Sequence, residues 1–106
     1  MSKYQAWKSF EQQIVQMFKS CGFKKARRNW DSQFKEKDTK DLVGTGPYVI
    51  QCKYGKRPNL IKAYKEAKKG SKEGEIPVGI CRFSKTRKTY CVLSLKDFKW
   101  LVNLNK

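Results

Sequence analysis

Residues 41–54 read DLVGTGPYVIQCKY, and this stretch decides how the rest of the chain is interpreted. Two glycines and a proline between its apolar segments predict a turn that joins two strands, 41–43 and 48–54. Side chains alternate across a strand, so Gln51 and Lys53 share one face of the second arm. We therefore expect a hairpin that brings Asp41, at the start of the first arm, alongside this face.

On the N-terminal side of the hairpin, apolar residues recur every three or four positions from 3 to 21. This spacing predicts an amphipathic helix that Gly22 ends. A short basic strand at 23–30 and a polar loop at 31–40 are expected to lead from the helix into the hairpin.

Four elements are expected after the hairpin: a helix at 60–69, strands at 77–83 and 89–95, and a helix at 96–104. Ser94 is expected to cap the last helix, which would pack through Phe98, Leu101 and Val102. The resulting order, α-β-β-β-α-β-β-α, favours an α/β (or α+β) class with a mixed central sheet flanked by helices. We expect a single domain covering 1–106.

The chain is strongly basic. It has 25 Lys and Arg residues against 9 Asp and Glu residues, a net charge of +16 over 106 residues. Repulsion among these charges disfavours the compact state unless a polyanion neutralises them. Nucleic acid is the expected partner, because each phosphate that is neutralised releases condensed counterions. The alternative is a highly soluble surface of scattered charge.

Several other functional classes are disfavoured. No apolar run approaches the roughly 20 residues that a membrane span needs, and the first ten residues are too polar for a signal peptide. The chain has no His and its four cysteines form no CxxC pair, which argues against zinc-finger and Ser-His-Asp chemistry. We expect a cytoplasmic location, nucleoid-associated or phage-encoded in a host cytoplasm, with no membrane partner and no small-molecule cofactor.

An acid, an amide and an ammonium group are expected to meet at the hairpin. Asp41, together with the oxygen of Gln51, would hold a hard divalent cation, Mg²⁺ or Mn²⁺. Such a cation polarises a phosphoryl oxygen and helps to generate hydroxide, while Lys53 would position the water or stabilise charge on the phosphate. Asp31 and Asp38 are alternative metal acids if the register differs.

These residues resemble the PD-(D/E)XK motif of restriction-endonuclease-like nucleases, in which an acid precedes an acid-x-Lys strand. The helix-first order and Glu11 within that helix resemble the Holliday-junction-resolvase branch and small phage-type nucleases. The resemblance covers nearly the whole chain in element order, but its identities rest on Glu11, Asp41, Gln51 and Lys53.

The resemblance implies a restriction-endonuclease-like core and a metal-dependent endodeoxyribonuclease. It also implies a homodimer acting on duplex or branched DNA, such as a Holliday junction, and the backbone carbonyl of Cys52 as a further metal ligand. The Cys52 side chain itself is expected in the core.

Gln51 departs from the family pattern, which usually has Glu or Asp at this position. A Gln oxygen can still coordinate a cation, but the site loses one negative charge and should bind metal more weakly. Glu11 would restore part of that charge if it reaches the site. Its alternative role is that of a surface acid at the border of the apolar stripe.

Basic side chains near the proposed site are the expected contacts to the DNA backbone. These are Lys24, Lys25, Arg27, Arg28, Lys56 and Arg57, with Arg82 as a possible phosphate clamp. Trp30 and Tyr54 would either stack on bases or pack in the core. Two further classes of function compete with a nuclease: a catalytically weakened DNA-binding module on the same fold, and a basic nucleoid- or ribosome-associated protein that binds RNA or DNA.

Overall fold

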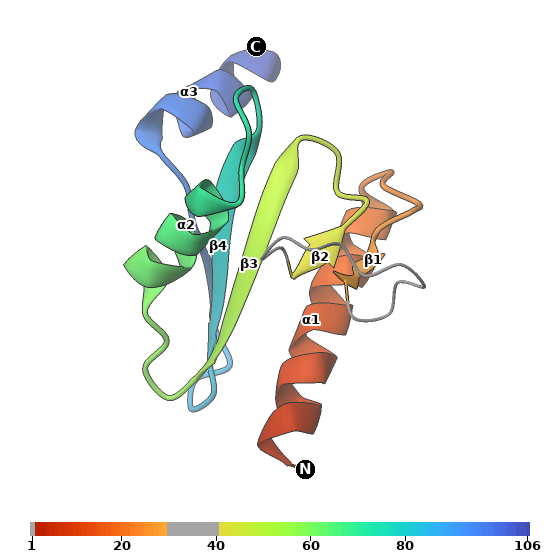
Figure 1. Cartoon of the computed structure of the whole chain (residues 1–106), viewed down its shortest axis with the longest axis vertical. Coiled ribbons are helices and arrows are strands. Elements are labelled where there is room, and N and C mark those ends of the chain that lie inside the picture. The colour runs from red at the N-terminus through yellow and green to blue at the C-terminus, as the bar shows by residue number, and fades with distance from the viewer. Residues whose placement is uncertain (1, 30–40) are drawn as a thin grey trace.

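The computed structural model describes residues 2–29 and 41–106 and shows a mixed α/β arrangement (Figure 1). The elements in chain order are α1 (Lys3–Ser20), β1 (Arg27–Arg28), β2 (Leu42–Val43), β3 (Tyr48–Gly55), α2 (Leu60–Lys69), β4 (Ile76–Phe83), β5 (Thr89–Val92) and α3 (Leu95–Leu104). Both the α/β class and the order of elements expected from the sequence are confirmed.

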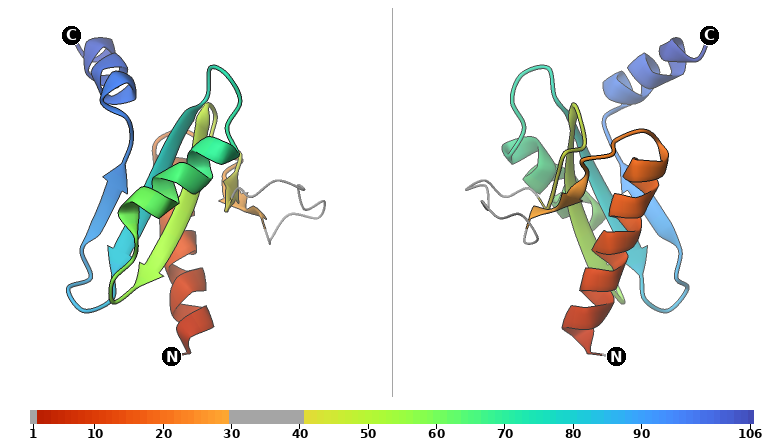
Figure 2. Two further views of the ribbon diagram at one scale, coloured as in Figure 1. Left: turned by 60° about the vertical axis from the view of Figure 1, so that its left-hand side comes forward. Right: turned by 90° about the vertical axis from the view of Figure 1, so that its right-hand side faces the viewer.

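The larger sheet contains β3, β4 and β5. Strand β3 pairs in parallel with β4, and α2 forms the crossover between them, whereas β4 pairs with β5 in the antiparallel direction. Helices α1 and α2 lie on opposite faces of this sheet (Figures 1 and 2). The mixed central sheet flanked by helices is therefore confirmed.

The expected hairpin is only partly correct. Strand β2 forms its ladder with β1, in a separate two-stranded sheet, and not with β3. The turn nevertheless brings the two segments together, because the backbone N–H of Asp41 donates to the carbonyl oxygen of Ile50 at 3.2 Å. The strand expected at 23–30 is limited to Arg27–Arg28, and the strand expected at 89–95 ends at Val92. The expected loop at 31–40 lies outside the described residues, as do Trp30, Asp31 and Asp38.

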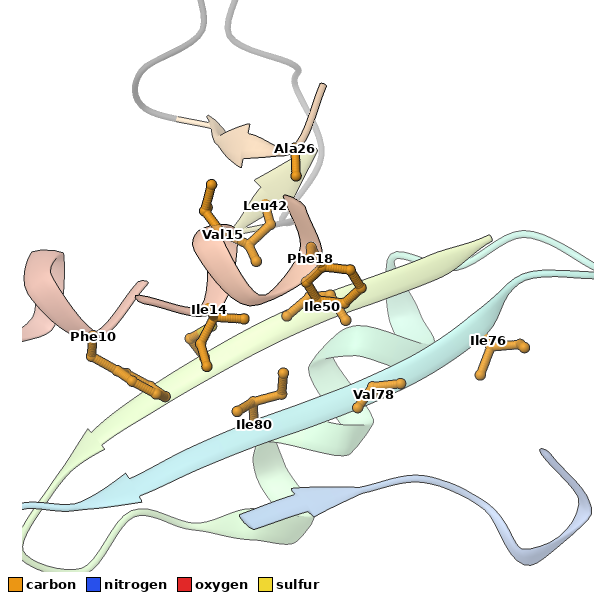
Figure 3. Packing of buried hydrophobic residues seen from close by; sticks show 11 residues of the cluster. Phe10, Ile14, Val15, Phe18, Ala26, Leu42, Ile50, Ile76, Val78 and Ile80 are labelled. Carbon is orange, nitrogen blue, oxygen red and sulfur yellow. The ribbon is translucent and has the colours of Figure 1, made fainter. Parts of the chain in front are cut away.

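The core lies between α1 and one face of the larger sheet. Phe10, Ile14 and Phe18 of α1 point toward Ile50 of β3 and Ile80 of β4 (Figure 3). Burying a side chain of this size stabilises the fold by about 1.5–3 kcal/mol. Cys52 belongs to the same cluster, so its expected place in the core is confirmed.

On the opposite face, α2 packs closely because small residues meet. Ala63 and Ala67 are fully buried, and the backbone of Gly79 in β4 lies directly beneath Ala63. The helix begins where the Asn59 side chain accepts from the N–H of Lys62 and ends at Gly70. These local signals explain why the helix spans the residues that the sequence predicts.

Helix α3 differs from expectation. Ser94 caps it as predicted, accepting from the N–H of Asp97. The helix buries no residue, however: Phe98 is 52% exposed and Val102 is 49% exposed. It continues past the end of β5, away from the sheet (Figure 2), so the expectation that it packs through Phe98, Leu101 and Val102 is wrong for this chain alone. Across 2–29 and 41–106, no helix is both long enough and apolar enough to cross a membrane.

Candidate metal centre at the edge of strand β3

Asp41 lies at the edge of β3 that β4 does not occupy. Its carboxylate Oδ2 accepts from the backbone N–H of Cys52 at 2.7 Å, in the place that a neighbouring strand would take. Its own backbone donates to Ile50 and accepts from the N–H of Asn29 at 2.9 Å. Three hydrogen bonds therefore hold Asp41 between β3 and the smaller sheet.

Glu11 reaches the same place from α1. It is only 4% exposed, so it is not a surface acid, and its Oε1 accepts from the Nε of Arg28 at 2.8 Å. Arg28, in β1, is equally buried at 4%. The expectation that Arg28 contacts a DNA phosphate is not supported, because its guanidinium is turned inward to a buried carboxylate.

The ligand atoms of Glu11, Asp41 and Cys52 all lie within 4.8 Å of one another. This crowding of acids has an electrostatic cost. Burial raises the pKa of Asp41 from 3.8 to about 7, the Cys52 hydrogen bond opposes the rise, and the charge of Glu11 adds to it. A divalent cation between the two carboxylates would remove this cost, since oxygen ligands of this kind suit Mg²⁺ and Mn²⁺.

The Cys52 thiol does not fit this role. Burial raises its pKa well above the usual range, and the charges of Asp41 and Glu11 raise it further. The thiol is therefore protonated at neutral pH, and only a thiolate is a strong ligand, preferring softer metals. Within the described residues, Glu11 and Asp41 are the side chains that fit a hard cation.

Gln51 and Lys53 lie on the face of β3 opposite Cys52, as alternation along the strand requires. This face is covered by α2, and the Nζ of Lys53 forms an ion pair of 2.8 Å with the Oε2 of Glu66. The acid of Asp41 and the ammonium of Lys53 were expected to meet at the hairpin. The charge of Lys53 does lower the pKa of Asp41, but the direct contact is with Glu66. Gln51 is buried at 5% exposure.

Glu66 is a site residue that the sequence interpretation missed. Its charge also raises the pKa of Asp41, so it belongs to the same electrostatic cluster. A signal was present: Glu66 lies between the inward-facing Ala63 and Ala67 on a helix whose other charged residues are lysines. With Glu66, three of the nine acids of this basic chain, Glu11, Asp41 and Glu66, gather around one strand edge.

The remaining basic residues proposed for DNA contact lie on the surface or are already paired. Lys24, Lys25, Arg27, Lys56 and Arg57 are exposed. Arg82 lies on the α1 side of the sheet, where it stacks over the ring of Phe10 at 4.8 Å and donates to Thr89 and Gln13. Tyr54 packs against Phe10, with ring centroids 6.1 Å apart, which favours its core role over base stacking.

Comparison with known proteins finds no matching family model, no matching curated protein and no matching solved structure.

Proposed function

We propose that the chain is a divalent-metal-dependent endodeoxyribonuclease of the PD-(D/E)XK type, with a restriction-endonuclease-like core and its centre at Asp41. The observation that carries the proposal is the approach of two carboxylates, the buried Glu11 and the half-buried Asp41, beside the strand that carries Gln51 and Lys53. Arg28 balances the charge of Glu11, whereas the Asp41 carboxyl has a pKa raised to about 7 by burial and by the charge of Glu11, and a bound cation would favour its ionised form.

Each residue has a distinct part in this proposal. Asp41 and Glu11 hold the cation, with Gln51 or the Cys52 carbonyl as a further oxygen ligand. The cation, when bound, supplies an activated water and polarises the scissile phosphate. Lys53 stabilises charge that develops on the phosphate, and Glu66 holds the Lys53 ammonium in place through its 2.8 Å ion pair.

The exposed basic residues support binding of the substrate. Lys56 and Arg57 directly follow β3, three and four positions beyond Lys53, and both are exposed. Side chains of this type contact the phosphate backbone and confer affinity with little sequence preference. DNA, either duplex or branched, is the proposed partner.

The proposal is tested by a cleavage assay with Mg²⁺ and with Mn²⁺. Labelled linear duplex, single strand, flap and four-way junction are compared for the wild-type chain and for Asp41→Asn. We expect metal-dependent cleavage of at least one substrate, reduced by 100-fold or more in Asp41→Asn, in line with the loss of a metal ligand. A charge-matched control, Glu73→Gln at an exposed position, should cleave like wild type.

A second pair of variants separates catalysis from binding. Lys53→Met should abolish cleavage and leave the affinity for DNA close to that of Lys65→Met, which removes the same charge from an exposed position of α2. Equal loss of cleavage in both variants would mean that Lys53 acts only as one more positive charge.

A catalytically weakened DNA-binding module is the second candidate function. The observation in its favour is that Glu11 and Lys53 already have partners, Arg28 and Glu66, so that part of the cluster is balanced without a metal. This candidate predicts tight, salt-sensitive DNA binding and no cleavage with either metal. Mn²⁺ binding, followed by electron paramagnetic resonance, would then be equal in wild type and Asp41→Asn.

A further inference from the structure

Helix α3 is apolar over most of its circumference and yet buries none of its residues. Leu95 is 80% exposed and Leu104 is 62% exposed, and the other exposed apolar residues are Phe98, Trp100 and Val102. Helical spacing leaves a polar strip formed by Lys96, Lys99 and Asn103, and Asp97 in the first turn is the one polar residue outside this strip. A helix with this pattern is normally covered, because exposed apolar patches of such size mark interaction surfaces.

An apolar groove lies next to α3, on the face of the sheet that α1 covers. Its volume is about 810 Å³, and its lining includes Ile14, Met17, Ile80, Cys91, Phe98 and Leu101. Phe98 and Leu101 come from α3 itself, so the exposed surface of the helix and the groove form one continuous patch. Met17 and Tyr90, both in the lining, are 43% and 47% exposed.

The groove is open because none of the helices and strands within 2–29 and 41–106 covers this part of the sheet. Helix α1 packs on β3, while Cys91 of β5, which lies opposite Ile80 in the register, stays exposed. Only Leu93 and Ser94 separate β5 from α3, and Ser94 is extended, with φ −68° and ψ 150°. This cap directs α3 past the end of the strand, as Figure 2 shows, so that only its first turns reach the groove.

We propose that a second copy of this chain covers the groove, with α3 of each copy lying against the α1 side of the sheet of the other. Large apolar residues are exposed both in the groove lining and on the rest of α3, seven in all: Met17, Tyr90 and Phe98 in the lining, and Leu95, Trp100, Val102 and Leu104 elsewhere on the helix. At roughly 100–150 Å² each, they offer about 800 Å², which is the area that one partner buries in a standard stable interface.

Charge also favours a second copy at this place. Two chains of +16 repel each other, so a dimer must form through the least charged surface available. In the described part of the chain, Arg82 is the one charged residue lining the groove, and it is held by Phe10, Thr89 and Gln13. Because the helix and the groove belong to the same patch, a two-fold axis places α3 of each copy over the groove of the other, so that both apolar surfaces are buried together. This inference does not rest on the proposed nuclease activity.

The experiment measures the mass of the full chain in solution, by light scattering and by sedimentation velocity, over a range of concentrations. Wild type is expected to be a dimer that dissociates on dilution. The double variant Phe98→Glu/Val102→Glu should weaken the dimer by 100-fold or more, while Asn103→Glu, on the polar strip, should leave it intact. A wild-type chain that is monomeric at every concentration, or equal masses for the double variant and the control, would overturn the proposal.

A thiol measurement guards against misfolding of the variant and identifies the occupant of the groove. In Cys21→Ser, Cys91 is the exposed cysteine that remains, since Cys52 and Cys81 are buried. Its alkylation should be slow in concentrated protein and at least 10-fold faster on dilution. Slow alkylation that does not change with concentration would show that α3 folds back onto its own groove, and fast alkylation at all concentrations would show that nothing covers it; either result contradicts the proposal.

Discussion

The carboxylate of Asp41 accepts a hydrogen bond of 2.7 Å from the backbone N–H of Cys52, eleven positions further along the chain. This bond attaches the segment before β2 to the open edge of β3. It also holds the carboxylate in a half-buried place near Glu11, where desolvation raises its pKa to about 7. The contact that completes the strand edge therefore places the carboxylate where burial and the charge of Glu11 impose an electrostatic cost, and the bond itself offsets only part of that cost.

Asp41 is expected to make the stability of the metal-free chain depend on pH. Its pKa is about 7 in the folded state and 3.8 in the reference state, so between these values the folded chain holds a proton that the unfolded chain has lost. Its contribution to the free energy of unfolding is therefore complete below about pH 4 and is lost as the pH rises through 7. Asp41→Asn should remove this loss and stabilise the chain at pH 8 by at most a few kcal/mol.

Urea denaturation at pH 5 and pH 8, without metal, checks this prediction, with Glu73→Gln as the control for loss of one charge. Added Mg²⁺ or Mn²⁺ should raise the stability of wild type at pH 8 and have little effect at pH 5, where Asp41 is protonated. The idea fails if Asp41→Asn and wild type respond alike to pH.

The buried ion pair between Glu11 and Arg28 is expected to couple strongly. Arg28→Met leaves the Glu11 carboxylate buried without its cation and should destabilise the chain by about 3–5 kcal/mol. The double variant Glu11→Gln/Arg28→Met removes both charges and should recover a large part of that loss. Denaturation of wild type, Glu11→Gln, Arg28→Met and the double variant gives the coupling energy, and additive effects would show that the pair does not act as a unit.

Arg28→Met also separates the two roles of Glu11, its ion pair with Arg28 and its proposed binding of the metal. Without the guanidinium, Glu11 is free to serve the metal, so Mg²⁺ should stabilise Arg28→Met more than it stabilises wild type. Equal stabilisation by Mg²⁺ in both proteins would place the cation away from Glu11.

Local signals in the sequence were sufficient to predict the helices and the longer strands. Asn59 and Gly70 define the ends of α2, and Ser94 defines the start of α3. The pairing of β2 with β1 could not be predicted in this way, because Arg27 and Arg28 show no apolar alternation and their partners lie fifteen or so positions away. Strand pairing at this distance is decided by tertiary packing and not by local pattern.

The candidate site, like the fold, was predicted where the signal is local and missed where it depends on distant residues. Asp41 and the strand with Gln51 and Lys53 were identified from one contiguous motif, and their approach to each other follows from the short turn between them. The partner of Lys53, Glu66, and the partner of Glu11, Arg28, were not found, because they arrive from other elements. The burial of Arg28 was missed for a further reason: in a chain with 25 basic residues, composition does not distinguish one inward-facing arginine from its exposed neighbours.

Gly79 is expected to control how closely α2 lies against the sheet. A Cβ at this position would come within 2.8 Å of the backbone N of Tyr64 and 2.9 Å of the Cβ of Ala63. Gly79→Ala should therefore push α2 away from β4 and destabilise the chain by about 1–3 kcal/mol, as overpacking does. Gly55→Ala, at the end of β3 with no atom within 4 Å of its Cβ, is the matched control. Chemical denaturation compares the two, and equal stabilities would mean that the contact relaxes without cost.

Gln51→Glu tests whether the lack of an acid at this position of the motif weakens metal binding and cleavage. Gln51 is buried beside Cys52, so a carboxylate there adds a further negative charge to the cluster around Asp41. Without metal, the variant should be less stable than wild type at pH 8, because one more acid is desolvated among like charges. With Mg²⁺ or Mn²⁺, it should bind metal at least 10-fold more tightly, as titration calorimetry would show, and cleave DNA at least as fast as wild type. Tighter binding without cleavage would indicate that the Gln51 amide has a role other than coordination, and unchanged metal affinity would place the cation away from β3.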